Sequence, residues 1–154
     1  MPHPLIETRH IRKRFGRQNK RESRNDGISA VNDVSLTIEA GSSVALVGES
    51  GSGKSTLGRM MSGLERPTEG QTLFRGTDIS SLSLKEMQPY RKQIQMIFQN
   101  SAGVFDPAYT IGQSIAEVLR NNGKAASKGC DEQVADILSR VGLEKSHGNR
   151  YGRE

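Results

Sequence analysis

Nine consecutive residues, from Gly48 to Thr56, carry the clearest chemistry in this sequence. They read Gly-Glu-Ser-Gly-Ser-Gly-Lys-Ser-Thr and satisfy the phosphate-loop pattern, in which Gly-x-x-x-x-Gly-Lys is followed by Ser or Thr. The pattern indicates that the chain binds a nucleoside triphosphate. The candidate nucleotide-binding residues are therefore Gly48, Glu49, Ser50, Gly51, Ser52, Gly53, Lys54, Ser55 and Thr56.

The residue types in this loop suit the binding of phosphate. Glycine lacks a β-carbon, so it permits positive φ and lets the backbone approach a ligand closely. Successive N–H groups can then point at an anion, and the start of a following helix favours the same negative charge. Lys54 would reach the β- and γ-phosphates, Ser55 would offer its hydroxyl to Mg²⁺, and Thr56 would lie near the α-phosphate. An ordinary glycine-rich turn is the alternative, and the fixed spacing argues against it.

The elements on either side of the loop have the order that the pattern requires. Ser43–Val47 is a short apolar run rich in β-branched residues, which predicts a buried parallel strand. Residues 55–62 can begin a helix. Earlier in the chain, alternating apolar and polar residues at 5–11 and 30–38 predict two antiparallel strands joined by a long polar loop.

The rest of the chain continues to mix strands and helices, so the fold class is α/β. Pro67 and Gly70 break the chain after the predicted helix. The following predicted elements are a short strand at 71–75, a helix at 83–92, a second core strand at 94–98, and amphipathic helices at 111–120 and 131–141.

Composition sets modest limits. The 154 residues, 33% hydrophobic and 25% charged, would make one domain with a workable core. No apolar run has the length of a membrane span and the start resembles no signal peptide, so we expect a cytoplasmic chain. Cys130 is the single cysteine and is interpreted as incidental. The three histidines, His3, His10 and His147, lack metal-ligand spacing. Mg²⁺ is therefore the one expected metal.

The net charge of +5 comes partly from a cluster of basic residues near the start of the chain. The cluster permits a nucleic-acid-binding interpretation, which predicts binding that falls steeply with salt. The segment from Gly16 to Ser29 is polar and nearly free of aromatic residues, so a solvated loop is the favoured interpretation and no nucleic acid is expected. The basic residues are Arg9, Arg12, Lys13, Arg14, Arg17, Lys20, Arg21 and Arg24.

Several separate motifs make the whole chain resemble the ATP-binding subunit of an ATP-binding cassette (ABC) transporter. Besides the phosphate loop they are residues 30–36, Gly63-Leu64, Pro67 to Gly70, and residues 94–99. The wording of residues 47–57 and 91–96 is most similar to the dipeptide, oligopeptide and nickel importer branch. The resemblance implies a P-loop NTPase core of the ABC ATPase kind, with an antiparallel β region, part of a helical region and an incomplete parallel sheet.

The resemblance also implies a division of the chain within one partial ATP-binding domain at 1–154. Residues 1–42 and 71–76 would form the antiparallel β region. Residues 43–70 and 77–99 would form half of the nucleotide-binding core, and residues 100–154 would begin the helical region.

Two further site residues follow from the resemblance. Gln99 corresponds to the Q-loop glutamine, whose amide oxygen can contact Mg²⁺ beside Ser55; on position alone it could be a polar strand end. Phe15 matches the position from which an aromatic ring stacks on adenine, although a core phenylalanine is the alternative. The segment 100–110 would face a membrane subunit, and it keeps the final proline of the family wording, Pro107, while the middle differs.

The chain stops where the family's signature motif would be about to begin. The signature, the Walker B aspartate, the catalytic glutamate and the switch histidine all follow that point, so the sequence offers no catalytic residue. Absent neighbours would also turn a central strand into an edge strand. We therefore expect the isolated chain to be marginally stable or prone to aggregation, and to lack appreciable ATPase activity.

The leading functional expectation is ATP binding, as the amino-terminal part of an ATPase subunit that energises import of peptides or related solutes. Its expected partners are transmembrane permease subunits and a second ATP-binding subunit, identical or different, on the inner face of the cell membrane. A truncated, non-hydrolysing nucleotide-binding remnant or regulator is the first alternative. A nucleic-acid-associated ATPase and a small-molecule kinase are weaker alternatives, and the cargo stays open.

Overall fold

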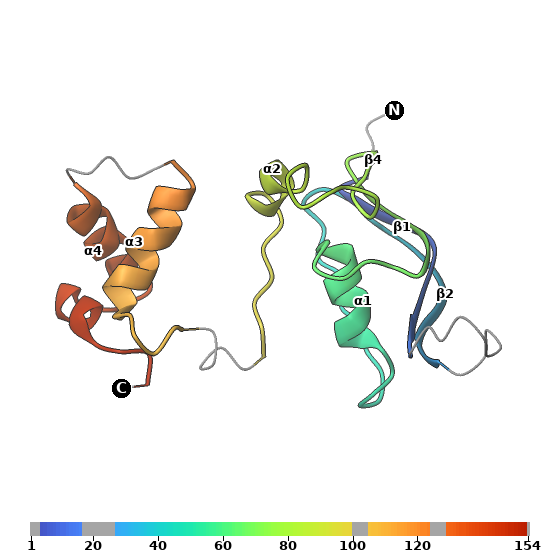
Figure 1. Ribbon diagram of the computed structural model, residues 1–154, viewed down its shortest axis with the longest axis horizontal. Coiled ribbons are helices and arrows are strands. Elements are labelled where there is room, and N and C mark those ends of the chain that lie inside the picture. The colour runs from blue at the N-terminus through green and yellow to red at the C-terminus, as the bar shows by residue number, and fades with distance from the viewer. Residues whose placement is uncertain (1–3, 17–26, 100–104, 124–128, 154) are drawn as a thin grey trace. The chain divides into compact units, whose positions relative to one another are not determined.

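A computed structural model describes residues 4–16, 27–99, 105–123 and 129–153 of the chain (Figure 1). The chain divides into two compact units, Met1–Met96 and Ile97–Glu154. The first unit holds a sheet and the phosphate loop, and the second is helical. Each unit is described separately.

The first unit is built on a four-stranded antiparallel sheet with the strand order β2-β1-β3-β4. The two long strands predicted from alternation are confirmed, and both extend beyond the predicted ranges. The third predicted strand is also confirmed, and a two-residue strand follows it. Their bounds are β1 Ile6–Phe15, β2 Ile28–Ile38, β3 Glu69–Phe74 and β4 Thr77–Asp78.

An irregularity in β1 changes the face to which its side chains point. Thr8 and Ile11 are three positions apart, yet both are buried, whereas regular strands alternate every second residue. The register between β1 and β2 shifts between these two residues, as at a β-bulge. Thr8 satisfies its buried hydroxyl by accepting a hydrogen bond of 3.0 Å from the N–H of Leu36. Simple alternation in the sequence does not predict this shift.

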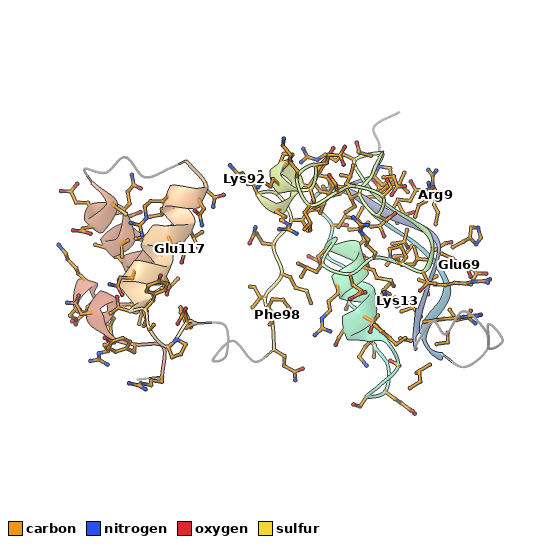
Figure 2. The ribbon with its side chains drawn as sticks, in the orientation of Figure 1. Arg9, Lys13, Glu69, Lys92, Phe98 and Glu117 are labelled. Atoms are coloured by element: carbon orange, nitrogen blue, oxygen red, sulfur yellow. The ribbon has the colours of Figure 1, made fainter. Side chains whose placement is uncertain are left out.

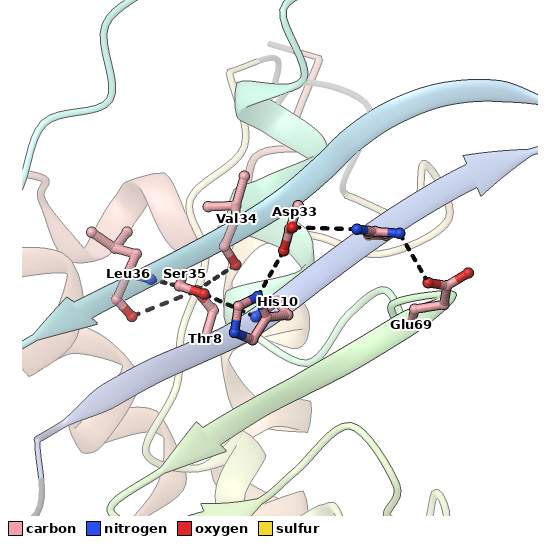
Figure 3. Close-up of polar contacts among 8 residues, drawn as sticks. Thr8, His10, Asp33, Val34, Ser35, Leu36 and Glu69 are labelled. Carbon is pink, nitrogen blue, oxygen red and sulfur yellow. Dashed lines mark hydrogen bonds and ion pairs between the residues drawn. The ribbon is translucent and has the colours of Figure 1, made fainter.

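Polar contacts hold the bulge together (Figure 3). His10 and Asp33 face each other from β1 and β2 with positive φ values of 49° and 55°, and His10 Nδ1 lies 2.8 Å from the Asp33 carboxylate. The His10 N–H donates to the Ser35 hydroxyl at 3.0 Å. Arg12 reaches Asp33 at 3.2 Å and Glu69 at 3.4 Å. Hydrogen bonds from His10 and Arg12 lower the pKa of Asp33.

This shift predicts a pH dependence of stability. A carboxyl group whose pKa is lower in the folded chain contributes stability that is present above its unfolded pKa, about 3.9, and is lost as pH falls through the folded value. Asp33→Asn should therefore flatten the acid limb of a plot of melting temperature against pH. Asn suits the positive φ at this position, so the change removes charge without adding backbone strain.

Glu39→Gln is the matched control for Asp33→Asn, because Glu39 is an exposed carboxylate just after β2. This variant removes one carboxylate of the same unit outside the bulge, so its acid limb is the reference for that of Asp33→Asn. Parallel acid limbs for Asp33→Asn and Glu39→Gln would contradict the assignment of Asp33 as an acid-sensitive group.

Helix α1, Lys54–Met61, confirms the helix predicted after the phosphate loop. Its apolar face contributes Leu57, Met60 and Met61 to a core cluster, where they pack against Ile11 and Val31 of the sheet. Burial of such side chains stabilises a fold by about 1.5–3 kcal/mol each. This cluster therefore fixes the start of α1, and with it the phosphate loop, against β1 and β2.

The prediction of two parallel strands, at 43–47 and 94–98, is wrong. Residues 43–47 and 94–98 contain no strand, and none of the described residues pairs with them in a sheet. The physical reason is that a parallel strand needs hydrogen-bonding neighbours from distant parts of a chain. Val47 and Ile97 are both 94% exposed, because neither segment is paired in a sheet.

The predicted helix at 83–92 is also too long. The structure has only the short helix α2, Gln88–Arg91, which Pro89 suits at its start. Before it, the Ser83 hydroxyl and N–H both donate to the Glu86 carboxylate, at 2.6 and 2.9 Å, and these bonds lower the pKa of Glu86. Local side-chain bonding of this kind competes with helix formation, which explains the late start.

In its described residues, 97–99, 105–123 and 129–153, the second unit has two helices and a 3₁₀ helix. Helix α3, Ile111–Asn121, begins with a reciprocal capping box between Thr110 and Gln113, and helix α4 spans Cys130–Arg140. Both amphipathic helices were predicted, and both are confirmed. The 3₁₀ helix η1, Lys145–Asn149, packs against them, and Leu138 is 2% exposed.

Candidate functional site

The phosphate loop forms an exposed turn that leads directly into α1. Ser52 donates a backbone hydrogen bond to the Glu49 carbonyl at 3.3 Å, and Gly51 and Gly53 have positive φ values of 80° and 91°. The first helical hydrogen bond runs from the Leu57 N–H to the Gly53 carbonyl at 2.8 Å. Among the residues that the structure describes, no side chain caps the start of α1. The first N–H groups of the helix therefore face outward without a side-chain acceptor, which suits an anion.

Lys54 folds back over this turn. Its ammonium donates to the Gly48 carbonyl at 2.8 Å, to the Glu49 carbonyl at 2.5 Å and to the Ser52 hydroxyl at 3.2 Å. All three acceptors are neutral oxygens that belong to the loop itself. An anionic phosphate is a stronger partner for an ammonium group than a neutral carbonyl, because charge-assisted hydrogen bonds are about twice as strong.

Gly53 fixes the loop to the sheet. A β-carbon at this position would lie 2.1 Å from the carbonyl oxygen of Ala30 in β2, closer than atoms can approach. The chain therefore needs glycine here for two reasons, its positive φ and the close contact with β2. Strand β2 therefore both contacts the loop and pairs with β1.

Phe15 lies at the end of β1, opposite Ile28 of β2. Ala30, two positions further along β2, contacts Gly53 of the loop. The residue is 46% exposed, so it is not the core phenylalanine of the alternative interpretation. The ammonium of Lys13 lies 5.1 Å from the centre of the Phe15 ring. Figure 2 labels Lys13 among the side chains of the first unit. A half-exposed aromatic ring on β1, the strand paired with the one that the loop contacts, fits a stacking surface for a base.

The residues of the loop fit a phosphate group and Mg²⁺. The exposed N–H groups, the Lys54 ammonium and the close approach enforced at Gly53 provide donors without bulky side chains. Ser55 is exposed at the second position of α1 and offers a hydroxyl ligand to a hard cation. Among the residues that the structure describes, no group of three or more His, Cys, Asp or Glu side chains could hold a metal.

Gln99 is exposed and belongs to the second unit, so its contact with Mg²⁺ stays a prediction. Residues 100–104 lie outside the described residues. In the remainder of the segment predicted to face a membrane subunit, the Ala108 N–H donates to the Asp106 carboxylate at 2.9 Å. The structure places Phe15 on β1, paired with the strand that Gly53 contacts, and the roles of Phe15 and Gln99 stay predictions.

The basic cluster of the sequence separates into two parts. Arg17, Lys20, Arg21 and Arg24 lie outside the described residues. Among the described residues of the cluster, ion pairs join Arg9 to Glu7, Arg12 to Asp33 and Glu69, and Lys13 to Glu65. These basic side chains therefore balance carboxylates of the same unit.

Lys13 is a neighbour of the Phe15 ring that the sequence interpretation did not single out. A signal was present, because residues two apart on a strand share a face, and Lys13 precedes Phe15 by two. The spacing predicts contact between the ammonium and the ring.

The fold and the glycine loop define a class: the chain has the P-loop NTPase fold of ABC ATPase cassettes. In support, 96% of the chain superposes on 61% of the dimeric post-hydrolysis structure of the ATP-binding cassette MJ0796 bound to ADP and Pi, with a TM-score of 0.76 and 22% identity. A cbiO1 structure from Clostridium perfringens, part of an ABC transporter complex, gives a TM-score of 0.68 at 23% identity over 96% of this chain and 53% of that one.

The family follows from the sequence comparison. The family described as ABC transporter matches residues 31–154, so this chain belongs to the ABC transporter family. Its curated relatives include the oligopeptide transport ATP-binding protein AppF of Bacillus subtilis, 39% identical over 97% of this chain, and OppF of Lactococcus lactis, 41% identical over 82%. The glutathione import ATP-binding protein GsiA of Salmonella paratyphi A is 39% identical over 98% of this chain.

The chain spans only part of these relatives: 46% of AppF, 40% of OppF and 24% of GsiA. No helix in the described parts of the chain is long and apolar enough to cross a membrane. The predicted resemblance to peptide-importer ATP-binding subunits is confirmed at the level of the family and its peptide and glutathione importers.

Proposed function

We propose that this chain binds ATP with Mg²⁺ at residues 48–56, as part of an ATPase subunit that energises import of peptides or related solutes. The observation that carries the proposal is the loop itself. An exposed glycine turn fixed on β2 presents uncapped helix N–H groups and the Lys54 ammonium to one side. The names of the relatives, oligopeptide and glutathione import ATP-binding proteins, support the cargo class.

Several residues of the loop have a proposed part in binding. The N–H groups of Gly51, Gly53 and Lys54 donate to phosphate oxygens. Lys54 exchanges its carbonyl acceptors for the β- and γ-phosphates, and Thr56 adds a hydroxyl near the α-phosphate. Ser55 and Gln99 offer oxygen ligands to Mg²⁺, which when bound neutralises phosphate charge. We assign no catalytic residue in this chain.

The proposal includes the working assembly of the whole protein. It would act on the cytoplasmic face of the membrane with permease subunits and a second ATP-binding subunit. The dimeric cassette structure among the structural neighbours supports such a pair.

Calorimetric titration with ATP, ADP and AMP, each with Mg²⁺, tests the nucleotide site. Because the loop recognises phosphates, affinity should fall stepwise as phosphates are removed, and AMP should bind at least about 100-fold more weakly than ATP. Equal affinity for ATP and AMP would show that the loop does not hold the β- and γ-phosphates.

Phe15→Ala should separate recognition of the base from recognition of the phosphates. Stacking of a base on an aromatic ring contributes about 1–3 kcal/mol, so the variant should bind ATP about tenfold more weakly. Its affinity for Mg²⁺-tripolyphosphate, which has no base, should not change. Phe15→Tyr keeps an aromatic ring and serves as the control. An equal loss for both ligands would identify Phe15 as a purely structural residue.

A further inference from the structure

Lys13 connects the exposed ring of Phe15 to the segment that follows α1. Its side chain is only 14% exposed and pairs with the Glu65 carboxylate, and its ammonium also donates to the Arg66 carbonyl at 2.8 Å. The same ammonium lies 5.1 Å from the centre of the Phe15 ring. Both contacts with residues 65–66 hold the cation in place, so it can act on the ring as a fixed group.

The backbone on either side of Lys13 is fixed as well. The Thr68 N–H donates to the Arg12 carbonyl at 2.7 Å, and the Arg14 N–H donates to the Thr68 hydroxyl at 3.1 Å. Two consecutive contacts to one threonine keep β1 and residues 65–68 in a constant relation. The Lys13 side chain therefore has little freedom in where it places its ammonium group.

This arrangement gives the Phe15 ring two different environments, the Lys13 ammonium and solvent. A cation within about 6 Å of a ring centre attracts the face of the ring, so the ammonium orients it. Phe15 is 46% exposed, so part of the residue is available to a ligand. Without the cation, a phenylalanine at the end of a strand can rotate among its side-chain conformations, and binding must then order it.

We propose that Lys13 is a positioning residue for the base of the bound nucleotide: held by Glu65 and the Arg66 carbonyl, its ammonium fixes the Phe15 ring in the orientation that stacks on the base. The proposal rests on the proposed ATP-binding function. It extends the site from the phosphate loop to the segment after α1. Lys13 acts through Phe15 and does not itself contact the phosphates.

Affinities of the purified protein for ATP and for tripolyphosphate, both with Mg²⁺, test this proposal. Lys13→Met keeps the length of the side chain and removes the charge, so ATP affinity should fall about fivefold while tripolyphosphate affinity stays the same. Lys13→Arg keeps a cation that also interacts with rings, and it should keep the ATP affinity. Lys92→Met, at an exposed lysine after α2, is the matched control and should change neither affinity.

A double variant separates positioning from a structural role. If Lys13 acts through Phe15, the combined change Lys13→Met with Phe15→Ala should weaken ATP binding no more than Phe15→Ala alone. Equal losses for ATP and tripolyphosphate in Lys13→Met, or a further loss in the double variant, would overturn the proposal. Failure of the unchanged protein to bind either ligand would overturn the proposed function itself.

Discussion

Replacing Lys54 by methionine should weaken ATP binding about 100-fold. In the structure the ammonium is held by the carbonyls of Gly48 and Glu49 and by the Ser52 hydroxyl, over the turn where the phosphates are proposed to bind. Hydrogen bonds to charged groups contribute about 1.5–3 kcal/mol each, and methionine can form none of them. Titration calorimetry with Mg²⁺-ATP measures the loss.

Two controls make the Lys54 experiment specific. Lys85→Met removes a lysine charge from the same unit, outside the site, and should leave ATP affinity unchanged. Thermal unfolding of Lys54→Met should show little change, because its bonds are made to an exposed loop. An ATP affinity within about threefold of the unchanged protein would contradict the role given to Lys54.

Replacing Gly53 by alanine should destabilise the first unit strongly. The left-handed conformation at φ 91° alone costs a residue with a β-carbon about 1–2 kcal/mol. The added carbon would also lie 2.1 Å from the Ala30 carbonyl oxygen, so the loop or β2 must shift. We expect a loss of at least about 3 kcal/mol in the free energy of unfolding, measured by chemical denaturation.

Gly51→Ala is a closely matched control for Gly53→Ala. Gly51 also has positive φ, at 80°, but nothing lies within 4 Å of the position of its missing β-carbon. This variant should therefore lose only the conformational part, about 1–2 kcal/mol. Equal losses for the two variants would show that contact between Gly53 and β2 does not fix the loop.

Local patterns in the sequence predicted the local features of the structure. The phosphate loop and helix α1 depend on neighbouring residues, since the glycines allow the turn and Leu57, Met60 and Met61 make one helix face apolar. The antiparallel strands β1 and β2 followed from alternation, and the helices α3 and α4 from amphipathic periodicity. In each case the determining residues lie within the element itself or next to it.

Features that depend on distant residues were not predictable in this way. The bulge at His10 and Asp33 needs β1 and β2 to be paired before their polar side chains meet. It also needs Gly70 of β3, where a β-carbon would lie 2.4 Å from the carbonyl oxygens of Arg9 and His10. Simple alternation assigns the wrong face beyond such a bulge.

The two missing parallel strands have the same cause. Val44, Leu46 and Val47 have the composition of a buried strand, but composition does not supply a pairing partner. Val47 is 94% exposed, whereas Val44 and Leu46 line part of an apolar groove of about 260 Å³ beside α1. Its lining consists of Ile6, Leu36, Ile38, Val44, Leu46, Gly58, Met61, Ser62, Ile94, Gln95 and Met96.

The central claim is that the loop from Gly48 to Thr56 is where the phosphates of ATP bind. Two-dimensional amide NMR of the labelled protein, recorded as Mg²⁺-ATP is added, tests it most directly. The largest shifts should appear at the N–H groups of Gly51, Gly53 and Lys54, and Lys54→Met should abolish them at the same ATP concentration. Saturable ATP binding that leaves these loop signals unmoved would contradict the account.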